Sequence, residues 1–117
     1  MKKFFSYIDK IIYINLDHRT DRNKEMLEHF EKYNIPKDKI VRLSATKHEK
    51  GNIGVYKSHI RALQYAIDNN LSNILIVEDD FDFNYSPEEL DIIFDEFENI
   101  FKNTYDVFQL VWGPSKA

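Results

Sequence analysis

The order of apolar and polar residues along the chain predicts strands that alternate with helices. Short apolar runs are typical of strands, and apolar residues spaced by three or four positions are typical of amphipathic helices. The predicted strands cover residues 11–14, 39–43, 74–77 and 106–111. The predicted helices cover residues 20–33, 55–68 and 87–102. Strands separated by helices favour an α/β fold, a mostly parallel sheet with right-handed crossovers and flanking helices.

Each predicted helix carries an apolar stripe that we expect to face the sheet. The stripes consist of Met26, Leu27, Phe30 and Tyr33 in the first helix, Tyr56, Ile60, Leu63 and Ile67 in the second, and Leu90, Ile93, Phe94, Phe97, Ile100 and Phe101 in the third. Thr20 is the expected N-cap of the first helix, and Ser86 with Glu89 predicts a capping box for the third. Gly51 and Gly54 are expected in the loop before the second helix.

The most informative feature is a run of three acids, Glu78-Asp79-Asp80, directly after the most hydrophobic predicted strand. That strand, Ile74–Val77, has no polar residue, which suits a parallel strand buried on both faces. Ligands of open α/β sheets bind outside the carboxyl ends of such strands. A divalent cation with oxygen ligands would relieve the repulsion between adjacent carboxylates. The alternative is a solvated acidic turn. Helix capping does not explain the acids, because Ser86 and Glu89 already cap the next helix.

A second charged segment, at residues 15–22, follows the first predicted strand and therefore lies on the same edge of the sheet. Its arginines, Arg19 and Arg22, could clamp a diphosphate, since guanidinium groups match phosphate oxygens and a helix N-terminus adds amide donors. In the alternative, Arg19 pairs with Asp17 or Asp21 in a charged connection. On the local pattern alone, the ion pair is favoured.

Two residues with catalytic potential, Ser58 and His59, follow the glycine pair near the start of the second predicted helix. The glycines, three positions apart, are a weak signal and can mark a turn with positive φ. A lone histidine at such a position is more often a hydrogen-bonded structural residue than a base. No acid nearby in the sequence completes a Ser-His triad, and the other histidines lack metal-ligand spacing.

Composition narrows the function classes. The 117 residues carry a formal net charge of -4, which argues against a general nucleic-acid binder. The absence of cysteine excludes disulfides and thiolate metal sites, and only three glycines make a Gly-rich phosphate loop implausible. No apolar run approaches the length of a membrane span, and Asp9 and Lys10 interrupt the apolar N-terminal stretch. We expect a cytoplasmic protein.

Taken together, three blocks resemble glycosyltransferase family 25, which includes bacterial lipopolysaccharide galactosyltransferases and collagen galactosyltransferases. The first block is Ile14-Asn15-Leu16 with Arg19 and Asp21-Arg22. The second is Gly-x-x-Gly followed by Ser58-His59 and Ala62-Leu63. The third is Ile76-Val77-Glu78-Asp79-Asp80. The resemblance runs from about Lys10 to Val111. It implies a GT-A-like, Rossmann-like fold that binds a nucleotide sugar.

The resemblance also implies a reaction and a set of site residues. A UDP-sugar, expected to be UDP-galactose, would give its sugar to an acceptor hydroxyl on a glycan or a hydroxylysine-type residue. Asp80, with Glu78 as a second ligand, would bind a divalent metal, expected to be Mn²⁺, on the donor diphosphate. Glu78 or Asp79 would assist through the metal, its waters or the ribose. The implied donor-binding residues are Asn15, Leu16, Arg19, Arg22, Ser58, His59, Glu78 and Asp79.

One departure from the family pattern is length. Family members usually continue past the strand predicted at 106–111, into the part that carries more of the acceptor site. We therefore expect a single donor-binding domain over residues 1–117, without that later part, that could act with a homo-oligomeric or other partner. Three alternatives remain. The chain could be a donor-binding remnant without turnover or a receiver-like signalling domain. It could also be an assembly module that uses the aromatic loop Phe81–Tyr85.

Overall fold

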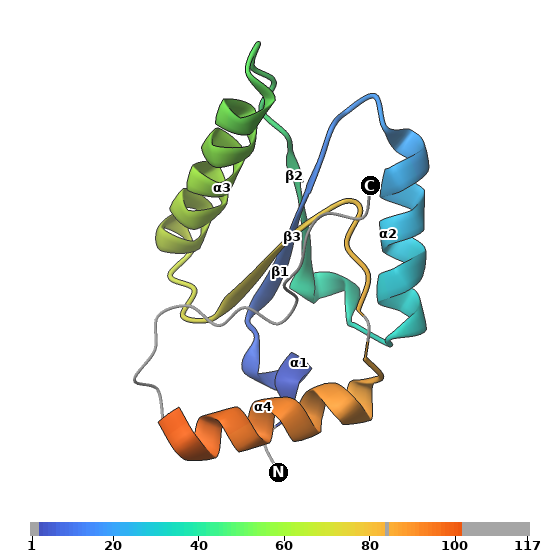
Figure 1. Ribbon diagram of the computed structural model, residues 1–117, viewed down its shortest axis with the longest axis vertical. Helices are drawn as coiled ribbons and strands as arrows, with labels where there is room; N and C mark the ends of the chain where they lie inside the picture. Colours follow the sequence, from blue (N-terminus) through green and yellow to red (C-terminus); the bar gives the residue numbers. More distant parts are fainter. Residues whose placement is uncertain (1–2, 84, 102–117) are drawn as a thin grey trace. The chain divides into compact units, whose positions relative to one another are not determined.

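Three parallel strands form one sheet in the computed structural model, which describes residues 3–83 and 85–101. The central strand is β1 (Lys10–Asn15), with β2 (Ile40–Ser44) on one side and β3 (Ile74–Glu78) on the other (Figure 1). The predicted α/β class and the first three predicted strands are confirmed. The arrangement is a small Rossmann-like core. The strand predicted at 106–111 lies outside the described residues.

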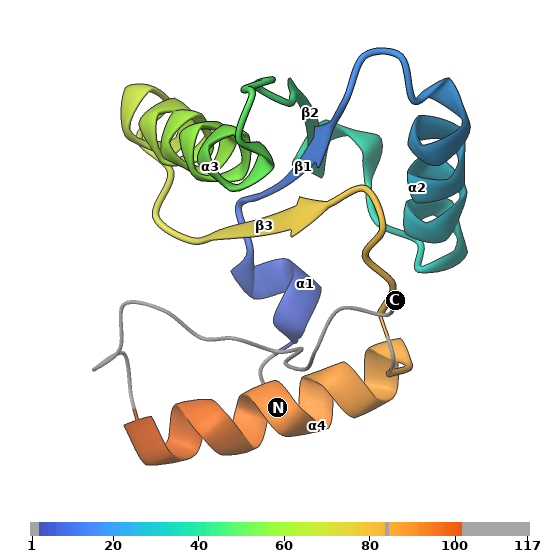
Figure 2. The same ribbon diagram turned by 45° about the horizontal axis from the view of Figure 1, so that its top comes forward.

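Helices connect the parallel strands. The helical elements are α1 (Phe4–Tyr7), α2 (Thr20–Lys32), the 3-10 turn η1 (Lys37–Lys39), α3 (Gly51–Asp68) and α4 (Pro87–Phe101). Helix α2 joins β1 to β2, and α3 joins β2 to β3. Figures 1 and 2 show these two helices on opposite sides of the sheet. The connection from β1 to β2 and the connection from β2 to β3 cross the sheet in opposite directions. If both are right-handed, their helices must lie on opposite faces.

The α2 side of the sheet is packed with large side chains. Met26 and Phe30 are each 1% exposed, and the Phe30 ring meets the Tyr13 ring edge to face at 5.6 Å. The Tyr13 hydroxyl donates to Asn23 Oδ1 at 2.6 Å, which satisfies its polar end inside this contact. The predicted stripe is wrong for Leu27, which is 45% exposed.

Helix α3 is oriented opposite to the prediction. Its stripe of large apolar residues faces outward, and its buried residues are Gly54, Ser58, Ala62 and Ala66. The two stripes are offset by two positions at their start and by one position at their end, or about 100–200° around the helix, so only one of them can face the sheet. Small side chains let α3 approach the strands closely. The sequence rule failed here because residue size, rather than hydrophobicity alone, decided which face was buried.

The most hydrophobic strand, β3, is an edge strand in the described sheet. Val77 is buried, but Ile74, Leu75 and Ile76 are only half-buried, so the prediction of burial on both faces is wrong. That burial belongs to β1, where every residue from Ile11 to Asn15 is buried. The central position between two neighbours explains this difference.

The predicted N-terminal cap or start is confirmed for one of the three long helices and is wrong for the other two. Thr20 is the first residue of α2 rather than its N-cap, which is Arg19 and makes no side-chain capping bond. Helix α3 begins at Gly51, so both glycines lie in the helix rather than in the preceding loop. Before α4, the capping box is confirmed: Glu89 N donates to Ser86 Oγ at 3.1 Å, and Ser86 N donates to Glu89 Oε1 at 2.9 Å.

The chain divides into two compact units, one of which is Phe5–Asp82 and contains the sheet. The other contains Phe4 and α4. In it Leu90 and Phe94 are buried as predicted, and the Phe4 and Phe94 rings lie 5.6 Å apart. Ile100 is 68% exposed, contrary to its predicted inward position, and the side chain of Phe101 lies outside the described part. Among the described helices, none has the length and apolarity needed to cross a bilayer.

Candidate functional site

The carboxyl ends of the three strands meet at one edge of the sheet. Asn15 pairs with Ser44 across β1 and β2, and Ile14 pairs with Glu78 across β1 and β3. In sheets with the strand order β2-β1-β3, ligands bind at the switch point between β1 and β3. The loop that starts at Leu16 and the acids after β3 border this point, as the sequence predicted.

The acidic triplet is separated by the geometry of the strand end. Side chains alternate between faces along a strand, and Val77 pairs in register with Tyr13, whose ring packs on α2. Asp79 continues on that side: Asn15 Nδ2 donates to its Oδ2 at 2.9 Å, and Arg22 Nη1 lies 3.3 Å from its Oδ1. Glu78 is exposed, Glu78 and Asp79 both line a pocket beside α3, and Asp80 is exposed. Donors to Asp79 therefore relieve much of the expected repulsion.

Asn15 links the three strand ends. Its side chain is buried, and besides Asp79 it donates to the Arg19 carbonyl at 3.1 Å and accepts from Arg42 Nε at 3.0 Å. Its main-chain oxygen accepts from Ala45 N at 2.9 Å. An amide can donate and accept at once, which a carboxylate at this position could not do. Asn15 therefore positions the edge rather than presenting a free group to a ligand.

Arg42 was missed by the sequence analysis, although its guanidinium connects the ends of β1 and β2. It donates to Asp17 Oδ1 at 2.7 Å, and the Ser44 hydroxyl donates to the same oxygen at 2.7 Å. These two donors lower the pKa of Asp17 below its usual value. The available signal was a single charged residue between apolar neighbours in a predicted strand, since such a side chain is expected to point to solvent.

The two arginines proposed as a diphosphate clamp both have carboxylate partners. Arg19 forms a two-pronged contact with Asp21, with Nε–Oδ1 and Nη2–Oδ2 distances of 3.0 Å. The Arg19 guanidinium lowers the pKa of Asp21 to about 2. Arg22 is directed to Asp79. The ion-pair alternative is confirmed for Arg19, with Asp21 rather than Asp17 as its partner.

Gly54 and Ser58 hold the loop between β2 and α3 against the helix. A Cβ on Gly54 would lie 2.6 Å from the Thr46 carbonyl oxygen, whereas a Cβ on Gly51 would meet nothing within 4 Å. Ser58 Oγ accepts from Thr46 N at 2.8 Å and donates to the Gly54 carbonyl at 2.9 Å. Close approach, rather than positive φ, therefore explains Gly54. Ser58 is buried and occupied as a clamp, and no described contact joins it to His59 as a catalytic pair.

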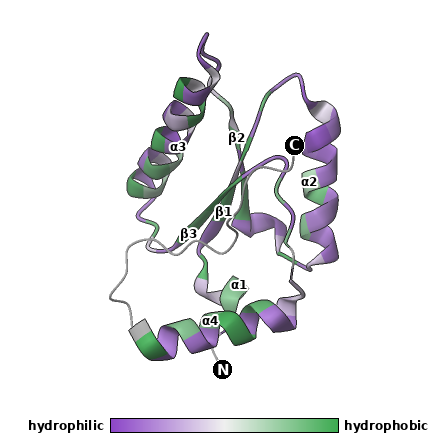
Figure 3. Cartoon of the chain, in the orientation of Figure 1, coloured by the Kyte–Doolittle hydropathy of each residue, from purple (hydrophilic) through white to green (hydrophobic). Residues whose placement is uncertain are grey.

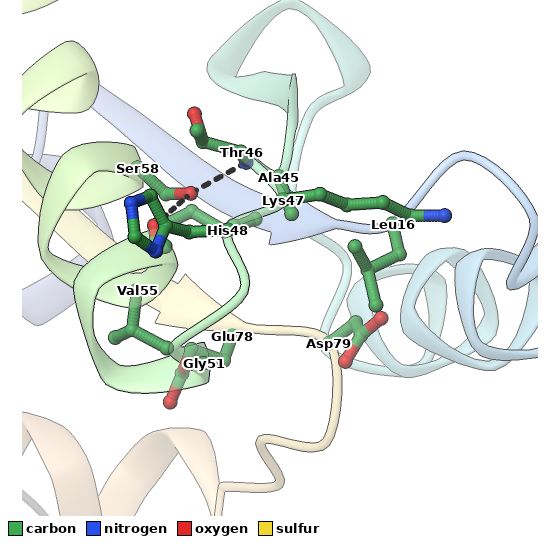
Figure 4. A pocket seen from close by; sticks show the side chains of 12 residues that line it. Leu16, Ala45, Thr46, Lys47, His48, Gly51, Val55, Ser58, Glu78 and Asp79 are labelled. Atoms are coloured by element: carbon green, nitrogen blue, oxygen red, sulfur yellow. Dashed lines mark hydrogen bonds between the residues drawn. The ribbon is translucent and has the colours of Figure 1, made fainter.

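A pocket of about 340 Å³ opens between this clamped loop and the ends of β1 and β3 (Figure 4). Its apolar side is formed by Ile14, Leu16, Ala45 and Val55. Its polar side is formed by Thr46, Lys47, His48, Ser58, Glu78 and Asp79. The volume is at the small end of the range for small-molecule sites, and the mixed lining is typical of them.

The pocket contains only some of the predicted site residues. Leu16, Ser58, Glu78 and Asp79 line it, whereas Asn15, Arg19, Arg22, His59 and Asp80 lie outside its lining. Sequence reasoning missed Lys47 and His48. Their signal was their place in the connection after β2, on the edge where ligands bind.

The two missed side chains, Lys47 and His48, lie in different parts of the pocket lining. Figure 4 shows Lys47 extending toward the side of Leu16 and His48 beside Ser58. His48 Nδ1 accepts a hydrogen bond from Lys50 N at 3.0 Å. In the neutral ring the proton is therefore on Nε2, which can donate to an anionic ligand.

The carboxylates of the edge can be tested against a divalent cation. In residues 3–83 and 85–101, no three His, Cys, Asp or Glu side chains gather into a complete protein-only site. A cation that is also bound by substrate phosphates needs only one or two carboxylates from the protein. Glu78 and Asp80 are exposed and fit that smaller role, whereas both oxygens of Asp79 already accept hydrogen bonds.

Comparisons of the chain with protein-family models, with curated proteins and with solved structures found no match. The function is therefore inferred from the motifs and the geometry of the edge.

Proposed function

We propose that this protein binds a UDP-sugar at the β1/β3 edge and, with a divalent cation, transfers the sugar to an acceptor hydroxyl. The observation that carries the proposal is the pocket itself. Leu16, Ser58 and Glu78 come from three separate sequence blocks, and all three line it. The same three blocks are those that resemble glycosyltransferase family 25, with UDP-galactose as the expected donor.

The pocket has groups suited to each part of a nucleotide sugar. Leu16 and Val55 offer an apolar wall for the base. Lys47 and His48 offer a cation and an N–H donor to the diphosphate. Glu78 can accept from sugar hydroxyls or, with Asp80, hold a divalent cation, expected to be Mn²⁺. When bound, such a cation supplies neutralisation of the negative charge on the leaving UDP.

Donor binding is tested by calorimetry with UDP and MnCl₂. We expect binding by the unaltered chain and a loss of roughly tenfold or more in affinity for Glu78→Gln and for Asp80→Asn, since each removes a charged oxygen ligand. Asp38→Asn is the matched control, because Asp38 is exposed at the amino end of β2, away from this edge. Absence of UDP binding by the unaltered chain, or equal binding by all variants, would overturn the donor site.

Transfer is tested separately from binding. We expect UDP release from UDP-galactose in the presence of MnCl₂ and a panel of glycan and hydroxylysine acceptors. Intact UDP binding without release across the panel would instead identify a donor-binding remnant.

The receiver-like alternative is favoured by one observation. Receiver domains share the strand order β2-β1-β3 and carry an acid after the third strand. However, the position after β1 is occupied by the buried amide Asn15, and the oxygens of Asp79 already accept two hydrogen bonds. Intact-mass measurement after acetyl phosphate treatment separates the two functions, because a phosphoryl adduct on the triplet would favour the receiver.

A further inference from the structure

The outer face of α3 presents a continuous apolar stripe. Its members and their exposed fractions are Tyr56 at 66%, Ile60 at 63%, Leu63 at 52% and Ile67 at 69%. Figure 3 shows hydrophobic segments alternating with polar ones along this helix. Scattered exposed apolar residues are ordinary, but an aligned row of four large ones marks an interaction surface.

The spacing of the stripe matches a helix–helix seam. The steps of four, three and four residues are those of alternating d and a positions in a coiled coil. The opposite face of α3, which carries Gly54, Ser58, Ala62 and Ala66, is already buried within the unit Phe5–Asp82. The stripe is therefore available to a second helix without disturbing the fold or the pocket.

We infer that the stripe binds α3 of a second copy of this chain, with the two helices antiparallel. Lys57 lies beside the stripe near its start, and Asp68 lies beside its end, where it accepts a hydrogen bond from Gln64 at 2.8 Å. An antiparallel two-fold arrangement places Tyr56 opposite Ile67 of the second copy, which brings Lys57 to within about one helical turn of its Asp68. In a parallel arrangement the flanks that carry Lys57 and Asp68 would lie on opposite sides of the seam, so these two residues could not pair.

The size of the seam sets the strength of the dimer. With one stripe of four residues from each copy, the buried area is at the small end of the range for specific interfaces. Interfaces of that size are weak and transient. The expected dissociation constant is on the order of 100 µM. This inference does not depend on the proposed function, because the stripe and the pocket occupy different parts of α3.

Sedimentation velocity from about 10 µM to about 1 mM tests the association, with the range set by the expected strength. The unaltered chain should shift from monomer to dimer, and Ile60→Asp should remain monomeric across the range. Leu27→Asp is the matched control, since Leu27 is an exposed leucine on α2 and should leave the shift unchanged. A chain that stays monomeric at the highest concentration, or an Ile60→Asp variant that still dimerises, would overturn the inference.

Disulfide cross-linking tests the antiparallel direction, and the absence of cysteine from the chain makes each introduced thiol unique. An equimolar mixture of Tyr56→Cys and Ile67→Cys should form a covalent heterodimer on mild oxidation. Tyr56→Cys alone should not, because two residues 56 would lie about 16 Å apart, beyond the roughly 7 Å limit between Cα atoms. Rapid cross-linking of Tyr56→Cys with itself, or none in the mixture, would contradict the antiparallel pair.

Discussion

The two sides of the sheet differ in the size of the side chains they bury. On the α2 side, Phe30 and Met26 fill the core, and Asp79 is held by hydrogen bonds. On the α3 side, the buried residues are small, Glu78 is exposed beside a pocket, and the large apolar residues face outward. The contrast indicates that the α2 side stabilises the fold, whereas the α3 side carries both of the contact surfaces that we propose, the pocket and the stripe.

The largest expected effect separates the two apolar faces. Phe30→Ala should lower the free energy of unfolding by about 3–5 kcal/mol, because it leaves a cavity against Tyr13. Leu63→Ala, on the exposed stripe, should change it by less than about 0.5 kcal/mol. Urea denaturation at low micromolar concentration, where the proposed dimer is dissociated, measures both. Similar losses for the two variants would refute the assigned faces.

The next effect separates two neighbouring acids. Asp79→Ala should cost about 1–3 kcal/mol, because it leaves the buried Asn15 amide and Arg22 without their acceptor. Glu78→Ala should change stability by less than about 0.5 kcal/mol and should weaken binding of UDP with Mn²⁺. Thermal unfolding and calorimetry on the same samples distinguish these outcomes. If Glu78→Ala proves the more destabilising change, the division of the triplet is wrong.

A smaller effect on stability tests how closely α3 approaches the loop between β2 and α3. Gly54→Ala forces a Cβ against the Thr46 carbonyl, a strain of about 1–3 kcal/mol, which the better helix propensity of alanine offsets by about 1 kcal/mol. Gly51→Ala carries no such strain, so it should be neutral or stabilising. The difference between their unfolding free energies measures the strain. Weaker UDP binding in Gly54→Ala alone would link the clamped loop to the pocket.

The sequence was sufficient for the α/β class and for placing the acidic triplet and Asn15 on one edge of the sheet. Apolar runs identified β1, β2 and β3, and the parallel arrangement then required Asn15 and the acidic triplet to share an edge. The capping box of α4 was also predictable, because Ser86 and Glu89 interact over three residues. These features depend on local periodicity or on a rule that holds for every parallel sheet.

The rest depended on contacts between distant residues. The orientation of α3 was mispredicted because it carries two opposite stripes, and only the spacing to the strands selects the small one. The role of Asp79 was not visible because its donors lie 57 and 64 positions away, at Arg22 and Asn15. Lys47 and His48 were missed because an irregular loop has no periodicity that shows which side chains face a pocket.

The smallest expected effect concerns Arg19, which is half-buried just before α2 and is held by Asp21. If Arg19 turns to a bound diphosphate, it must first leave Asp21, and a solvent-exposed ion pair of this kind is only weakly stabilising. Asp21→Asn should therefore raise UDP affinity by about two- to fivefold. The depressed pKa of Asp21, about 2, keeps the carboxylate charged above the acid range. Its contribution is present above its unfolded pKa and is lost only as pH falls toward 2, so the gain should be constant between about pH 6 and 8. Calorimetry measures the UDP affinity of Asp21→Asn, Arg19→Gln and the double variant, which completes a double-mutant cycle. A gain that persists in the Arg19→Gln background would show that Asp21 acts as a repulsive charge and does not compete for Arg19.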